Sequence, residues 1–155
     1  MNKKGLSLVV FVISIAVALA LTTVITTSYS VIANSTKLRE FGNEINQLQK
    51  AVDEYNFLNN EYPIYQKYSL DLEFVDASVR SKQFGTETGS LEFYIIDLQK
   101  LGRSEIRRGN PINIQTRNAY AISKNNGKVY YLAGVNIGDD WYYTLTDEIK
   151  EKLDI

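Results

Sequence analysis

The stretch that decides the fold runs from residue 5 to residue 36 and reads GLSLVVFVISIAVALALTTVITTSYSVIANST. It contains no charged side chain, and residues 6–25 are almost entirely Leu, Val, Ile, Ala and Phe. A helix needs about 20 apolar residues to cross the hydrocarbon core of a bilayer. The sequence therefore predicts a single transmembrane helix over about residues 6–28. Lys3 and Lys4 place its short N-terminal side in the cytoplasm, and the rest of the chain then lies outside the cytoplasm.

A cleaved secretory signal is the competing interpretation of the same stretch. Lys3 and Lys4 would be its basic region, and Ala18-Leu19-Ala20 has the form of a cleavage site. However, the apolar character continues past Ala20 to Ile32, whereas the apolar core of a signal peptide is about 7 to 15 residues long. An uncut span fits the sequence better.

The helical pattern does not end with the apolar stretch. Apolar residues recur at spacings of three and four, at Leu38, Phe41, Ile45, Leu48, Val52, Tyr55 and Leu58. This spacing predicts an amphipathic continuation of the helix, with a weak point or kink at Gly42. Asn59, Asn60 and Pro63 end the helix, because the residue before a proline avoids the helical conformation. The apolar stripe packs on the chain's own domain or forms a coiled-coil contact, and its short length favours the first.

The C-terminal third is predicted to be an antiparallel meander of about three to four strands. The β-rich runs cover residues 119–123, 128–132, 134–137 and 141–145. Asn125-Asn126-Gly127 and Gly138-Asp139-Asp140 are turn sequences between them. Thr146 is a good N-cap for a short final helix. The amphipathic helix is the expected cover for the apolar face of this sheet.

The middle of the chain gives weaker signals. Residues 62–89 carry short alternating patches and a glycine-flanked loop over residues 85–89. Residues 91–101 fit a short helix that stops at Gly102. Residues 103–111 form a basic loop, whose simplest interpretation is solvated charge. Together with the meander, these segments indicate one α+β domain over residues 61–155, which follows the long helix.

Composition excludes most catalytic chemistry. The chain has no Cys and no His, which removes disulfides, thiol nucleophiles, zinc-thiolate sites and histidine-dependent triads. Its 17 basic and 18 acidic residues nearly cancel, so no nucleic-acid partner is indicated. No nucleophile and base stand at an interpretable spacing. We therefore expect no enzyme, no cofactor and no metal.

Two features of the meander are open to a binding interpretation. Tyr130, Tyr131, Tyr142 and Tyr143 resemble an aromatic platform for sugar or peptide, although tyrosine also suits half-buried strands, which is the simpler interpretation. Asp139 and Asp140 supply too few oxygens for Ca²⁺, which takes six to eight, and are better explained as a turn.

With these residues in view, the chain resembles the type IV pilin-like proteins, which include the pseudopilins of type II secretion and competence systems. The resemblance lies in Lys4-Gly5-Leu6-Ser7-Leu8-Val9-Val10 opening an apolar helix, and in Tyr55 followed by Asn60-Glu61-Tyr62-Pro63 at its end. The runs at residues 127–131 and 141–146 also look like such proteins from low-GC Gram-positive bacteria. The resemblance covers nearly the whole chain, and its N-terminal part is the specific one.

The resemblance implies processing and assembly. A prepilin peptidase would cut between Gly5 and Leu6 and methylate the new amine of Leu6, so residues 1–5 would be a leader and residues 6–60 the long helix. The implied function is a structural subunit of a pilus-like filament or secretion pseudopilus at the cell membrane and cell surface. Its partners would be membrane lipid, the peptidase and other pilin-like subunits.

One position departs from the family pattern. Members that polymerise usually carry Glu at the fifth place after the cut, where it neutralises the terminal amine of a neighbouring subunit, and this chain has Val10 there. A minor or tip subunit, a diverged relative and a signal-anchored protein that is never processed all fit this departure. The alternative function is a single-pass membrane-anchored extracellular binding module that does not assemble.

Overall fold

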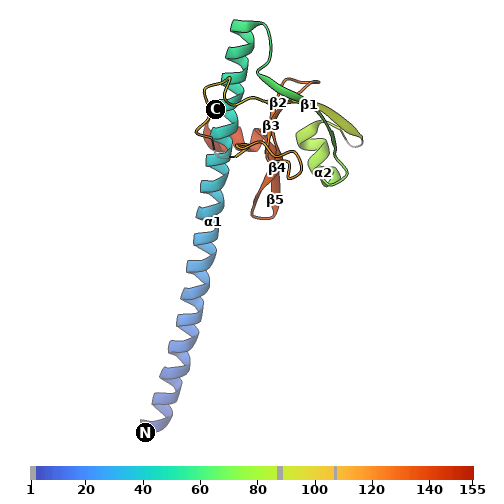
Figure 1. Cartoon of the computed structure of the whole chain (residues 1–155). Coiled ribbons are helices and arrows are strands. Elements are labelled where there is room, and N and C mark those ends of the chain that lie inside the picture. The colour runs from blue at the N-terminus through green and yellow to red at the C-terminus, as the bar shows by residue number, and fades with distance from the viewer. Residues whose placement is uncertain (1–2, 87–88, 107) are drawn as a thin grey trace. The chain divides into compact units, whose positions relative to one another are not determined.

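The computed structural model describes residues 3–86, 89–106 and 108–155, and within its first helix it describes side chains at residues 12–17 and from residue 29 onward. The chain divides into two compact units, Met1–Lys37 and Leu38–Ile155. A single helix, α1 (Lys3–Asn59), forms the first unit and continues into the second (Figure 1). It ends at Asn59, where the sequence predicts its end.

The predicted transmembrane half of this helix requires a correction. Across the part of the chain that the structure describes, no helix is long and apolar enough to span a membrane. The predicted fold class, a pilin-like fold with residues 6–28 in the bilayer, is therefore wrong in this element, although its α+β content agrees with the structure.

The second unit is built on one antiparallel sheet of five strands in the order β1-β2-β3-β4-β5. The strands are β1 (Ile64–Asp71), β2 (Ser90–Ile96), β3 (Tyr120–Ser123), β4 (Val129–Ile137) and β5 (Asp140–Thr144). Each strand pairs with the next one along the chain, so the sheet is a meander with β1 and β5 at its edges.

Three predictions for the sheet were wrong in detail. The five strands exceed the three to four expected, because β1 and β2 precede the predicted meander. Residues 91–101 do not form a helix, since their first half is the strand β2. The predicted strands at 128–132 and 134–137 are one strand, β4, whose register against β5 shifts between Tyr130 and Val135.

Both faces of the sheet are buried, whereas the sequence predicted cover on one. On the first face, the stripe of α1 (Leu38, Phe41, Ile45, Leu48 and Val52) packs with Tyr120, Ile122, Val129 and Tyr131. This confirms that the amphipathic stripe packs on the chain's own domain. On the second face, Val75 and Phe84 pack with alternate residues of the same strands, including Ala121, Tyr130 and Leu132. Phe84 ends the π-helical turn η1 (Arg80–Phe84), which follows the short helix α2 (Ala77–Val79).

Gly42 is a point of close packing between helices. The final helix, α3 (Asp147–Leu153), is capped by Thr146, whose Oγ1 accepts a hydrogen bond of 3.3 Å from the backbone N–H of Ile149, as predicted. A Cβ at Gly42 would lie 2.3 Å from Cγ2 of Ile149 and 2.7 Å from Cδ1 of Leu153. Helix α1 continues through this residue. The lack of a side chain at Gly42 therefore lets α3 pack directly against α1. Gly42 does not end or break the helix.

Gln49 fixes α1 to the hairpin between β3 and β4. Its Oε1 accepts a hydrogen bond of 2.8 Å from the N–H of Val129, and its Nε2 donates to the carbonyl of Gly127 at 3.1 Å. Both bonds satisfy backbone groups at the predicted Asn125-Asn126-Gly127 turn. The helix is thus held to the sheet by specific polar contacts in addition to the apolar stripe.

Candidate functional site

The predicted processing site lies at the start of α1. Gly5 and Leu6 fall within the helix, but the side chains of Leu6 and Val10 lie outside the described residues. The predicted cut between Gly5 and Leu6, and the effect of Val10 on assembly, therefore stay predictions.

The first unit exposes several apolar side chains. Val12, Ile13, Ile15 and Val17 are between 44% and 57% exposed, and Tyr29, Val31 and Ile32 are more exposed still. Because successive helical residues are about 100° apart, positions 12, 13, 15 and 17 point to different sides of the helix. A helix that is apolar on all sides is normally buried in a larger assembly or core. Residues 12–17 approach this composition, with Ser14 on the side that the four apolar residues leave uncovered.

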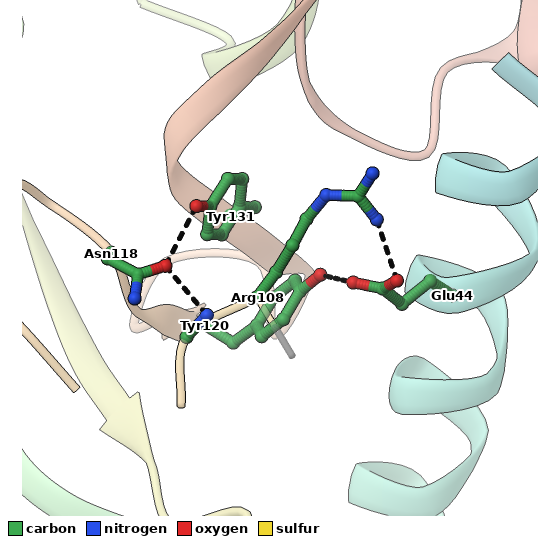
Figure 2. A network of polar contacts seen from close by, with 6 residues as sticks. Glu44, Arg108, Asn118, Tyr120 and Tyr131 are labelled. Carbon is green, nitrogen blue, oxygen red and sulfur yellow. Dashed lines mark hydrogen bonds and ion pairs between the residues drawn. The ribbon is translucent and has the colours of Figure 1, made fainter. Parts of the chain in front are cut away.

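A polar network joins α1 to the loop between β2 and β3 (Figure 2). Glu44, on α1, accepts a hydrogen bond from the Tyr120 hydroxyl at one carboxylate oxygen. Its other oxygen pairs with Nη1 of Arg108 at 2.7 Å, and both side chains are partly buried. A carboxylate removed from water needs such partners, because burying an unpaired charge is costly.

Asn118 holds the other end of this loop. Its Oδ1 accepts a hydrogen bond of 2.8 Å from the hydroxyl of Tyr131, as Figure 2 shows. The same oxygen accepts a hydrogen bond of 2.8 Å from the N–H of Gly109. Its Nδ2 donates to the carbonyl of Pro111 at 3.0 Å. Gly109 has a φ of +70°, and a Cβ there would lie 3.0 Å from Cδ2 of Tyr120. Only glycine therefore fits this position without a shift of Tyr120.

The network has the character of a structural contact. Burial, with the hydrogen bond to Glu44 as the second cause, raises the pKa of Tyr120 far above its ordinary value. A phenol that resists ionisation is a poor proton donor or nucleophile near neutral pH. Glu44 has both oxygens engaged by Arg108 and Tyr120, so it offers no free carboxylate for acid-base chemistry.

The structure also bears on the two binding interpretations of the meander. Tyr130, Tyr131, Tyr142 and Tyr143 are all buried, so these four rings do not form an exposed platform. Asp139 lies in the turn between β4 and β5, as predicted, and Asp140 is the first residue of β5. Within residues 3–86, 89–106 and 108–155, no group of three or more acidic, Cys or His side chains is placed to hold a metal ion.

The network residues were missed by the analysis of the sequence. Arg108 belongs to the segment interpreted as solvated charge, and Glu44 was one of several charged residues between the apolar positions of the helix. They are 64 residues apart in the chain, and no local pattern links them. The one local signal for Glu44 is its position next to Ile45, which is buried against the sheet.

Compared with known protein families, with curated proteins and with solved structures, the chain has no match. Its function is therefore argued from the surfaces and contacts described above.

Proposed function

We propose that the protein is a non-catalytic structural subunit that assembles through the N-terminal part of α1 into a pilus-like filament or a secretion pseudopilus. The observation that carries the proposal is the exposure of Val12, Ile13, Ile15 and Val17 in the single chain. Burying apolar surface contributes about 25 cal/mol per Å². Copies that pack these helices together therefore gain free energy from surface that is otherwise exposed to water.

The second unit supports this role by giving the helix a fixed base. Five residues of α1 are buried against the sheet, and Gln49 and Glu44 add polar contacts to the strands and to the loop. The part of α1 within the second unit is thus anchored over about four turns. A subunit that carries load along a filament needs its helix fixed to its folded domain in this way.

Processing by a prepilin peptidase at Gly5 and Leu6 is part of the proposal. It rests on the resemblance of residues 4–10 to the pilin-like proteins. Val10 removes the carboxylate that usually pairs with the terminal amine of the neighbouring subunit. The proposed role is therefore one in which few such amines are buried, as for a minor or tip subunit.

Site-specific photo-crosslinking in the native host tests the assembly. A photoreactive amino acid placed at position 13 should form adducts to the N-terminal helix of a second subunit, which is this chain or a similar one, identified by mass spectrometry. The same group at Ser69, an exposed residue of β1, is the matched control and should give none of these helix adducts. Absence of helix-to-helix adducts at position 13 would contradict the proposal.

A further inference from the structure

Trp141 differs in exposure from the four tyrosines of β4 and β5. It is 43% exposed, whereas Tyr130, Tyr131, Tyr142 and Tyr143 are buried. Its indole stacks on Tyr143, with ring centroids 6.5 Å apart and planes inclined by 26°. The indole is therefore backed by Tyr143 on one side and partly open to solvent on the other.

Two hollows meet at this tryptophan. The first, of about 400 Å³, is lined by residues that include Lys82, Asp140 and Glu148. The second, of about 240 Å³, is lined by residues that include Asp76 and Arg117. Trp141 and Val79 line both. The larger hollow falls within the range of about 300–1,000 Å³ that small-molecule sites occupy.

The groove formed by these hollows has fixed walls. The side chain of Gln83 bridges η1 to the edge strand β5: its Nε2 donates to the carbonyl of Trp141 at 2.6 Å, and its Oε1 accepts from the N–H of Tyr143 at 2.8 Å. These bonds occupy the outward backbone groups of β5 on both sides of Tyr142. A peptide strand therefore cannot pair with β5 at these positions.

The charges around the groove favour a neutral ligand. Lys82 and Arg117 balance Asp76 and Asp140 in number, while Asp147 and Glu148 are paired with Lys150 and Lys152. The guanidinium of Arg117 lies 3.6 Å from the ring centre of Phe74. It covers one face of the Phe74 ring.

We propose that the Trp141 groove binds a neutral saccharide. The apolar C–H face of a sugar ring would stack on the exposed indole. Its hydroxyl groups would exchange hydrogen bonds with the donors Lys82 and Arg117 and the acceptors Asp76 and Asp140, which line the two hollows. The proposal does not depend on filament assembly, because every residue of the groove lies in the second unit.

Because Trp141 is the one tryptophan of the chain, its fluorescence reports binding at the groove. The full chain, kept in solution by a polyoxyethylene detergent that carries no sugar, is titrated with cellotetraose, maltotetraose and chitotetraose as neutral probes. Tetra-galacturonate and tetramethylammonium are the charged probes. We expect a saturable change in tryptophan emission with at least one neutral probe and none with the charged ones.

Calorimetry with three variants then assigns the site. Trp141→Ala should weaken binding of the responding saccharide at least about tenfold, and Trp141→Phe, which keeps an aromatic ring in β5, should weaken it less. Tyr65→Ala removes an aromatic residue that is 60% exposed on the opposite edge strand, and should leave binding unchanged. Circular dichroism checks that each variant is folded.

Several outcomes would overturn the proposal. They are a lack of response to all three neutral saccharides, a response confined to tetra-galacturonate or tetramethylammonium, and equal weakening by Trp141→Ala and Tyr65→Ala.

Discussion

Glu44 of α1 and Arg108 of the loop between β2 and β3 form an ion pair of 2.7 Å across 64 residues of sequence. Because Glu44 also accepts a hydrogen bond from the hydroxyl of Tyr120, one carboxylate ties the helix to the loop and to the sheet. The pair therefore fixes how the helix and the basic loop are placed within the second unit.

Removal of this carboxylate should destabilise the second unit. Glu44→Ala leaves the Tyr120 hydroxyl and the Arg108 guanidinium without their partner, and an unsatisfied buried group costs about 1–3 kcal/mol. Chemical denaturation of the full chain measures the loss in the free energy of unfolding. Glu40→Ala is the matched control, because Glu40 is exposed on the same helix, and it should change stability by less than about 0.5 kcal/mol. Equal effects of the two substitutions would show that the network contributes nothing.

Gly42 should be intolerant of a side chain. Gly42→Ala gains about 1 kcal/mol of helix propensity, but its Cβ would lie 2.3 Å from Ile149, which is fully buried. Forcing extra volume into a packed contact costs about 1–3 kcal/mol, so we expect a net loss of stability. In an Ile149→Ala background the clash is absent, and the same substitution should instead stabilise the protein. A stabilising Gly42→Ala in the unmodified chain would refute the close approach of α3.

Gln83 should stabilise the packing of η1 against the edge strand β5. Gln83→Glu keeps an acceptor for the N–H of Tyr143 but removes the donor to the carbonyl of Trp141, and places a carboxylate against that carbonyl. We expect a loss of about 1–3 kcal/mol in the free energy of unfolding, measured by denaturation. Ser81→Ala, at an exposed position of the same turn η1, is the control and should be neutral. Hydrogen exchange of the Tyr143 amide should accelerate only in the Gln83 variant.

Alkaline pH should destabilise the fold through buried tyrosines. Burial, followed by the charge of Glu148, raises the pKa of Tyr142 from 10.0 to about 12. The unfolded chain releases this proton first, so the contribution of Tyr142 is complete below pH 10 and is lost as the pH rises through about 12. The free energy of unfolding should therefore fall over this interval. Tyr142→Phe should reduce the slope of that fall, and an unchanged slope would argue against the assignment.

The sequence predicted those parts of the fold that a local pattern of residues marks. The spacing of Leu38, Phe41, Ile45, Leu48 and Val52 identified the buried stripe, and Thr146 identified the start of the last helix. The stripe was extended too far, because Leu58 is exposed at the end of α1. The helix there passes beyond the apolar cluster on the sheet.

The strand β2 was not predicted from the sequence, for a physical reason. Phe93 and Ile95 face one core cluster and Ile96 belongs to the other, so apolar residues occur on both faces and the usual alternation is lost. The polar contacts of Glu44 and Gln83 were equally hidden, since their partners are distant in the chain. The apolar composition of residues 6–28, in turn, predicted a membrane span that the described part of the chain does not contain.

The central claim is that this chain is processed and built into a filament through α1. The most direct test is the mass and N-terminal residue of the protein recovered from surface filaments sheared from its native host. If the proposed function is correct, the chain is present in this fraction and begins at a methylated Leu6. A chain that still begins at Met1, or that is missing from the filament fraction while abundant in the cell, would contradict it.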